Sequence, residues 1–236
     1  MKNNLEINKF QGLKWVAISS QNEVIAIGSN PDNVYFEAIS KGEHTPTIIR
    51  GYIEHKIDYY FEKYFSDKGE NGYSNVYNDV FSPRRDDFIT LLEIGIGTLT
   101  PTHSNMLFWK DKHPEYLPGA SLRAFQDYFP RGIILGIDIQ PDCMIKDTRI
   151  VTHMVDSTDK IACDDIFNGY KFDFIIDDGD HNYISQIKTF ENFFGKLSPG
   201  GVYILEDLES PQDLMNYFVS TKFNWEMRDR MIIIRK

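Results

Sequence analysis

The feature that most constrains the fold is an apolar segment that ends abruptly in acidic residues. Residues 172–176 read Phe-Asp-Phe-Ile-Ile, and residues 177–181 read Asp-Asp-Gly-Asp-His. A strand buried on both faces of a sheet is a nearly continuous apolar run, and ligands of open α/β sheets bind beyond the carboxyl ends of such strands. The segment therefore predicts a buried parallel strand with a binding site at its carboxyl end.

From residue 88 onward, segments typical of strands alternate with segments typical of helices. The expected strands are residues 90–94, 133–137, 150–154, 172–176 and 202–205. The expected helices are residues 121–128, 164–167, 183–196 and 211–221, and two closing strands follow at 223–227 and 231–234. This alternation predicts an α/β fold for residues 88–236, a Rossmann-like, seven-stranded, mostly parallel sheet with helices on both faces.

Residues 1–50 predict a small separate module with the order ββαβ. Asn30, followed by Pro31, is typical of a helix N-terminus. The expected strands are residues 14–18, 23–27 and 47–50. Because the module contains no catalytic motif, its role is open, with packing or assembly of a homo-oligomer as the plain interpretations.

Residues 51–87 predict a helical connecting segment that is rich in tyrosine and phenylalanine. These aromatic side chains would either line a pocket or cover an edge of the sheet. A break at residues 66–69, which read Ser-Asp-Lys-Gly, offers a hydroxyl, a carboxylate and an amine that can hold a polar ligand.

Composition excludes several classes of protein. The chain has 236 residues, 42% of them hydrophobic, and a formal net charge of -10, which indicates a globular protein without the basic face that nucleic acid binding requires. Cys143 and Cys163 belong to no CxxC motif. No apolar run approaches the roughly 20 residues that cross a bilayer, and the first residues lack a signal-peptide pattern. We expect a cytoplasmic protein without a membrane span.

A second strand end carries acidic residues as well. Residues 200–205 read Gly-Gly-Val-Tyr-Ile-Leu and run into Glu206 and Asp207. If this strand lies parallel to the strand before Asp178, the three carboxylates converge with His181 above them. Oxygen ligands in that number suit Mg²⁺, Mn²⁺ or Ca²⁺ better than zinc.

This cluster suggests a chemistry for an acceptor with neighbouring hydroxyls. Such an acceptor can chelate a divalent ion, which lowers the pKa of its hydroxyl, and His181 would then remove the proton. The alternative interpretation is that Asp177 and Asp180 cap the following helix and that His181 is a surface residue.

A nucleotide site is indicated at other strand ends. Gly95 and Gly97 follow the strand at 90–94, and Asp138 ends the next strand, where a carboxylate can accept hydrogen bonds from ribose hydroxyls. Thr100 replaces the third glycine of a dinucleotide motif, and Asp138 lies 43 residues past Gly95, which disfavours NAD. An adenosine without a pyrophosphate, as in S-adenosylmethionine, fits this pattern.

Two further segments belong to this end of the sheet. Asp156 follows the strand at 150–154 and would either accept a hydrogen bond from an adenine amino group or cap a helix. Residues 98–118 form a polar stretch long enough to be a lid or a binding loop.

Several segments resemble class I S-adenosylmethionine-dependent methyltransferases, in particular the metal-dependent sugar O-methyltransferases of the mycinamicin and tylosin type. The segments are residues 93–97 (EIGIG), 118–123 (PGASLR), 128–130 (YFP), 136–139 (GIDI), 176–181 (IDDGDH) and 200–207 (GGVYILED). The resemblance covers roughly residues 60–236. It implies methyl transfer from S-adenosylmethionine to a sugar hydroxyl of a glycoside or an activated sugar, in natural-product or surface-polysaccharide synthesis, with Mg²⁺ or Mn²⁺.

Carried over by motif, the resemblance implies a role for each matched residue. His181 is expected as the base, and Asp178, Glu206 and Asp207 as metal ligands. The expected cofactor-binding residues are Glu93, Gly95, Gly97, Ser121, Asp138, Asp156 and Asp177.

Two departures limit the resemblance. Asp180 stands where the family has serine, and residues 1–50 are unlike the family's auxiliary domain. The alternatives are an O-methyltransferase for a non-sugar diol or catechol and a non-catalytic cofactor-binding protein.

Overall fold

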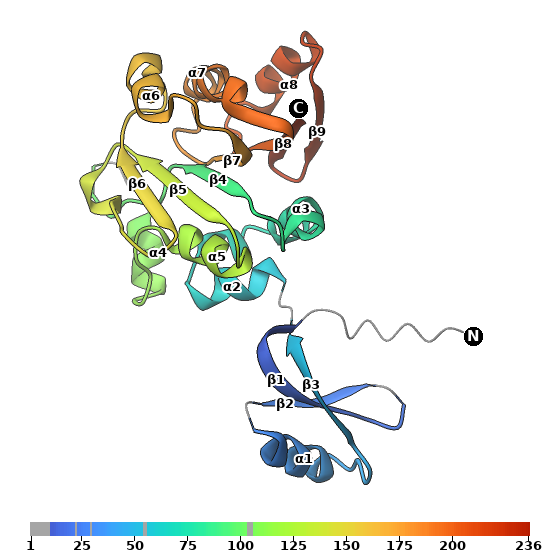
Figure 1. Cartoon of the computed structure of the whole chain (residues 1–236). Coiled ribbons are helices and arrows are strands. Elements are labelled where there is room, and N and C mark those ends of the chain that lie inside the picture. The colour runs from blue at the N-terminus through green and yellow to red at the C-terminus, as the bar shows by residue number, and fades with distance from the viewer. Residues whose placement is uncertain (1–9, 22, 29, 54–55, 103–105) are drawn as a thin grey trace. The chain divides into compact units, whose positions relative to one another are not determined.

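The computed structural model describes residues 10–21, 23–28, 30–53, 56–102 and 106–236. Contacts divide the chain into two compact units, Met1–His55 and Lys56–Lys236. Of the expected connecting segment 51–87, residues 56–87 belong to the same unit as the large sheet (Figure 1).

The N-terminal unit is a three-stranded antiparallel sheet with one helix, as the sequence predicted. Its elements are β1 (Phe10–Ile18), β2 (Val24–Gly28), α1 (Pro31–Ser40) and β3 (Thr47–Ile53), with the strand order β2-β1-β3. The Asn30 side chain caps α1 by accepting hydrogen bonds from two backbone amides of its first turn. Ala17 and Ala26 pack with Val34 and Ala38 of α1 in a small core.

The larger unit contains the predicted seven-stranded sheet. Its strands are β4 (Thr90–Ile94), β5 (Ile133–Asp138), β6 (Ile150–Met154), β7 (Phe172–Asp177), β8 (Leu197–Leu205), β9 (Asn224–Arg228) and β10 (Met231–Arg235). The strand order is β6-β5-β4-β7-β8-β10-β9; the first five strands are parallel, and β10 runs antiparallel to both β8 and β9. This arrangement confirms the expected fold class.

Helices lie on both sides of this sheet. They are α2 (Ile57–Lys63), α3 (Ser74–Phe81), α4 (Met106–Lys112), α5 (Ala120–Tyr128), α6 (Lys160–Phe167), α7 (Tyr183–Phe193) and α8 (Pro211–Val219). Short 3-10 helices occur at Asp67–Gly69, Ser82–Arg84, Pro141–Cys143 and Phe194–Lys196. The polar stretch 98–118, expected to be a loop, thus contains the helix α4.

Strand alternation separates two apolar cores, one on each face of the sheet. Leu91 of β4 packs with residues of α2, α3 and α5, whereas Leu92 packs with residues of α6, α7 and α8. The aromatic residues of α2 and α3 lie in the first core, where Phe81 contacts Phe174 of β7 with ring centroids 4.8 Å apart. These aromatics therefore cover the sheet.

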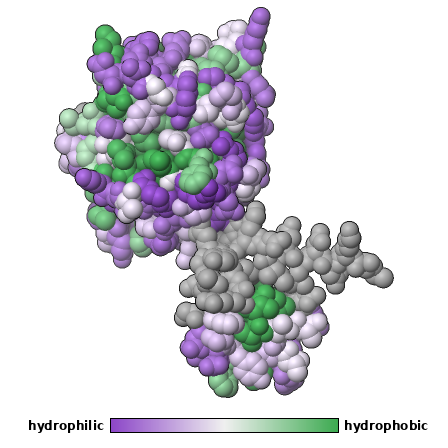
Figure 2. Space-filling model, viewed as in Figure 1, coloured by the Kyte–Doolittle hydropathy of each residue, from purple (hydrophilic) through white to green (hydrophobic). Residues whose placement is uncertain are grey.

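Figure 2 shows hydrophilic residues over most of the visible face of the larger unit, around an apolar patch. Within the described residues, no helix combines the length and the apolar character needed to cross a membrane.

Candidate active site

A cavity of about 560 Å³ opens at the carboxyl ends of the parallel strands. Residues that follow β4, β5, β6, β7 and β8 all line it, as the position of ligands in open α/β sheets requires. Its volume is in the range of small-molecule sites. Residues 66–68 and 120–121 line it from the helical side.

Two glycines shape the turn after β4. Gly95 has φ +80°, and a Cβ there would lie 2.1 Å from the carbonyl oxygen of Asp178. Gly97 has φ +81°, and a Cβ there would lie 2.1 Å from the hydroxyl oxygen of Tyr116. Both positions therefore need glycine for conformation and for space, and both line the cavity.

Asp138, at the end of β5, holds this turn in place. Its Oδ2 accepts a hydrogen bond from the Ile96 amide at 3.0 Å, and its Oδ1 accepts one from the Gln140 amide at 3.0 Å. Besides these two amides, the Cys143 thiol also donates a hydrogen bond to this carboxylate, which has four lone pairs and so keeps acceptor capacity for a ligand. Asp138 lines the cavity.

Asp156, after β6, is exposed at the cavity wall. Its Oδ1 accepts hydrogen bonds from the amide and the hydroxyl of Thr158, both at 2.8 Å. The residue that caps α6 is Asp159, which accepts hydrogen bonds from Ile161 and Ala162. The alternative role of Asp156 as a helix cap is therefore wrong.

The ends of β7 and β8 bring acidic residues and a histidine together. The two strands pair in parallel, with Asp177 opposite Leu205, so the residues after them are neighbours. His181 Nε2 lies 3.5 Å from Asp178 Oδ1. Potential ligand atoms of Asp178, His181 and Asp207 all lie within 4.8 Å of one another.

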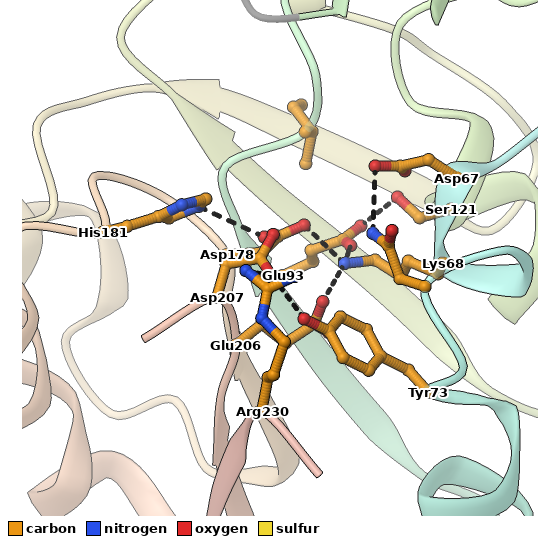
Figure 3. Close-up of polar contacts among 12 residues, drawn as sticks. Asp67, Lys68, Tyr73, Glu93, Ser121, Asp178, His181, Glu206, Asp207 and Arg230 are labelled. Atoms are coloured by element: carbon orange, nitrogen blue, oxygen red, sulfur yellow. Dashed lines mark hydrogen bonds and ion pairs between the residues drawn. The ribbon is translucent and has the colours of Figure 1, made fainter. Parts of the chain in front are cut away.

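Lys68 reaches these residues from the side of Asp67 and Ser121 (Figure 3). Its Nζ is 2.5 Å from Asp178 Oδ2, 2.8 Å from Glu206 Oε2 and 3.4 Å from Glu93 Oε1, and its side chain is only 2% exposed. A buried lysine requires such partners, because a charge removed from water without compensation is costly. The sequence marked this residue only as part of the Ser-Asp-Lys-Gly break.

Asp207 is held from the other side. The Tyr73 hydroxyl donates a hydrogen bond to Asp207 Oδ1, and Arg230 Nη2 lies 3.1 Å from the same oxygen (Figure 3). Asp207 itself has φ +47°, a conformation that is uncommon for residues other than glycine.

Two expected cofactor-binding residues do not line the cavity. Glu93 is fully buried, accepts a hydrogen bond from Ser121 Oγ at 2.6 Å and pairs with Lys68. Asp177 is also buried, on the opposite face of the sheet, where it accepts a hydrogen bond from the Tyr203 hydroxyl at 3.1 Å. We correct both to supporting positions; Gly95, Gly97, Ser121, Asp138 and Asp156 do line the cavity.

Burial and charge shift the pKa of these groups in opposite directions. Burial raises the pKa of Glu206 to about 7, against the effect of Lys68. Burial also raises the pKa of Asp178, but Lys68 and His181 outweigh it and the net pKa is lowered. For His181, burial lowers the pKa. The contact with Asp178 and the nearby acidic charges together outweigh burial, so the net pKa is raised.

The donor set fits a divalent cation. Glu206 Oε1 is buried without a hydrogen-bond partner, while Lys68 engages the other oxygen of the same carboxylate. Asp178 Oδ1 and Asp207 face the same region, and such oxygens suit Mg²⁺ or Mn²⁺. The expected ligand Glu206 is not in the convergent group of Asp178, His181 and Asp207 but lies behind it with one free oxygen.

No family model matches the chain. The 8-demethyl-8-alpha-L-rhamnosyl tetracenomycin-C 2'-O-methyltransferase of Streptomyces olivaceus is 32% identical over 147 residues, which are 61% of this chain and 35% of that protein. Demethylmacrocin O-methyltransferase of Streptomyces fradiae is 30% identical over 186 residues, 77% of this chain and 43% of that protein.

A solved structure shows the same relationship. The MycE methyltransferase of mycinamycin biosynthesis, in complex with Mg, SAH and mycinamycin VI, aligns with a TM-score of 0.63 and 25% identity over 78% of this chain and 55% of that chain. The strand order and the position of the site are thus those of the class I methyltransferase fold. Within that class, the chain is a relative of the S-adenosylmethionine-dependent O-methyltransferases that act on sugars of macrolides and other glycosides. It spans less than half the length of the two curated relatives.

Proposed function

We propose that the protein transfers a methyl group from S-adenosylmethionine to a sugar hydroxyl of a glycoside or an activated sugar, with Mg²⁺ or Mn²⁺ as the metal. The observation that carries the proposal is the convergence of Asp178, His181 and Asp207 in the same cavity as the turn after β4 and Asp138. One cavity thus contains groups suited to a cofactor, a cation and a proton acceptor.

The cofactor would occupy the end of the cavity formed by β4, β5 and β6. Asp138 keeps acceptor capacity for a ribose hydroxyl, because each of its oxygens accepts only one backbone hydrogen bond. Gly95 and Gly97 allow the backbone to pass close to the ligand. Asp156, exposed at the wall, would accept a hydrogen bond from the adenine amino group.

The acceptor would lie at the other end, beside His181. Asp178 and Asp207, with Glu206 Oε1 behind them, would hold a divalent cation, which would lower the pKa of a hydroxyl bound to it. His181 accepts the proton from the acceptor hydroxyl as the oxygen attacks the methyl carbon; the methyl–sulfur bond of S-adenosylmethionine breaks, and S-adenosylhomocysteine leaves with the electron pair. Because Asp178 Oδ1 lies 3.5 Å from Nε2, the carboxylate stabilises the positive charge that the imidazole gains.

The relatives support the sugar as acceptor. Their names specify rhamnosyl, mycinamicin and macrocin glycosides, and the MycE complex contains Mg with SAH. A non-sugar diol or a catechol would use the same cavity, because neighbouring hydroxyls chelate a cation in the same way. A non-catalytic binding protein would keep the cofactor end alone.

The test is a methyl-transfer assay with isotopically labelled S-adenosylmethionine and a panel of acceptors. The panel contains neutral O-glycosides of deoxysugars, nucleotide-activated sugars, a catechol and a simple diol, each with Mg²⁺ and with EDTA. We expect labelled product from a sugar acceptor that EDTA abolishes. Transfer to the catechol alone would favour the rival acceptor, and cofactor binding without product from any acceptor would contradict catalysis.

A further inference from the structure

One segment of the chain contacts all three expected metal ligands, Asp178, Glu206 and Asp207. Lys68, in the 3-10 helix Asp67–Gly69, contacts Asp178 and Glu206, and Tyr73, immediately before α3, contacts Asp207. In each case the contact uses one oxygen of the carboxylate. Figure 3 shows both side chains reaching the acidic residues from the helical side of the site.

Lys68 contacts one oxygen of each partner carboxylate and leaves the other oxygen available. Its ammonium lies 2.5 Å from Asp178 Oδ2 and 2.8 Å from Glu206 Oε2. Asp178 Oδ1 therefore faces His181, and Glu206 Oε1 keeps no hydrogen-bond partner. A cation on one side of a carboxylate fixes its rotation, so the oxygen on the other side points in a defined direction.

Tyr73 acts on Asp207 in the same way. Its side chain is 1% exposed, so the hydroxyl has little freedom to leave Asp207 Oδ1. The position of Tyr73 is fixed by packing in the core of α2, α3 and α5.

We propose that Lys68 and Tyr73 are positioning residues for the metal ligands, a role that rests on the proposed function. They set the rotation of Asp178, Glu206 and Asp207, so that the site is formed before the metal arrives. Ligands that are already oriented bind a metal more tightly, because no rotation has to be fixed on binding.

The same lysine connects the two ends of the cavity. Its Nζ lies 3.4 Å from Glu93 Oε1, and Glu93 accepts a hydrogen bond from Ser121 Oγ, which lines the cofactor end. Lys68 thus lies between a wall of the cofactor end and the metal ligands. Removing its charge is expected to weaken metal binding strongly and S-adenosylhomocysteine binding much less, because Ser121 and Glu93 keep their own hydrogen bond.

The first variant to test is Lys68→Met, which keeps an unbranched side chain that is one atom shorter and removes its charge. Calorimetric titration with Mn²⁺ is expected to show an affinity about 10- to 100-fold weaker than in the wild type. The matched control is Lys112→Met, because Lys112 also pairs with a carboxylate, Glu70, at 2.5 Å but its side chain is 47% exposed. The control should bind Mn²⁺ like the wild type.

Tyr73→Phe keeps the inference testable if Lys68→Met does not fold, because it removes only a hydroxyl. It should weaken Mn²⁺ binding while S-adenosylhomocysteine binding and the unfolding temperature stay close to wild type. Unchanged or tighter Mn²⁺ binding in a folded Lys68→Met, or in Tyr73→Phe, overturns the positioning role of that residue. A wild type that binds S-adenosylhomocysteine but no Mn²⁺ overturns the inference and the metal, and one that binds neither overturns the proposed function.

Discussion

The site is built from two regions that reach it by different physical means. The residues after β4, β5, β7 and β8 are placed by the hydrogen bonds and register of a parallel sheet. Residues 66–73 are placed by the packing of aromatic side chains from α2 and α3 against the sheet. The sheet thus supplies the groups proposed to bind and react, whereas the helical segment orients those groups and balances their charge.

The difference explains which parts of the site a sequence reveals. A strand end is a local pattern, since an apolar run followed by acidic residues or glycines can be recognised within ten residues. The role of Lys68 depends on partners 110 and 138 positions away. A local sequence pattern cannot predict such a contact.

The largest expected effect is on the sheet side. His181→Ala should lower turnover about 100- to 10,000-fold, the usual contribution of a positioned base, and leave cofactor affinity unchanged. Rates of methyl transfer and calorimetric S-adenosylhomocysteine titration would measure the two effects. His44→Ala, at an exposed position of the N-terminal unit, is the control. Full turnover in His181→Ala would remove this residue from catalysis.

Two glycine variants separate the energetic cost of a positive φ from the cost of close packing at the turn after β4. Gly72 and Gly95 have nearly the same φ, +82° and +80°, but only Gly95 has neighbours within 4 Å of an added Cβ. Gly72→Ala should therefore cost about 1–2 kcal/mol of the free energy of unfolding. Gly95→Ala should cost about 2–5 kcal/mol, because the Asp178 backbone must also move.

Urea unfolding of both glycine variants gives the comparison. Equal losses of stability would mean that the approach of the β4 turn to Asp178 is not tightly fixed. A larger loss in Gly95→Ala would show that the turn and the end of β7 form one packed unit.

The smallest expected effect lies outside both regions. Asp164 of α6 accepts hydrogen bonds from Lys160 and Lys196, both at 2.5 Å, which lower its pKa from the ordinary value of 3.8 to about 2. A pKa lowered in the folded state gives stability above pH 3.8 that is lost as the pH falls through about 2. Asp164→Asn should therefore have a slightly lower unfolding temperature at pH 7, and the difference should shrink on acidification.

Thermal unfolding between pH 7 and pH 2 measures this effect, because the contribution is lost between the ordinary pKa of 3.8 and the lowered pKa of about 2. Asp165→Asn, the exposed neighbour on the same helix, is the control. A difference between the wild type and Asp164→Asn that stays constant over this range would contradict the ion pairs as its cause.

The strands were largely predictable because their apolar runs are long and bounded by turn residues. The one clear error in the sheet concerns β8, which starts at Leu197 rather than at residue 202. Its first half contains Pro199 and Gly200, which are typical of turns, and Gly200 does have φ +77°. The helix α4 was missed because it has only seven residues and its apolar residues are consecutive, so they form no helical periodicity; none of them is buried in the structure.

The alternation of side chains along a strand explains why Glu93 and Asp177 do not line the cavity. Glu93 follows Leu92 in β4 and points to the face of α2 and α5, where Lys68 lies. Asp177 follows Ile176 in β7 and points to the other face, where Tyr203 lies. Because side chains alternate along a strand, Glu93 and Asp177 point into the two cores, and the cavity is lined by the last residues of the strands and the residues that follow them. The motif identified both residues, but this alternation determines what they contact.

Calorimetric titration of S-adenosylhomocysteine into the wild type and Asp138→Ala tests the central claim most directly. Asp138 lies at the cofactor end, away from the metal ligands, so the titration measures the cofactor site alone. We predict saturable one-to-one binding by the wild type and at least about tenfold weaker binding by the variant, since a hydrogen bond from a neutral donor to a charged group is worth about 1.5–3 kcal/mol. No binding by the wild type, or equal binding by both proteins, would contradict a cofactor site at the ends of β4 and β5.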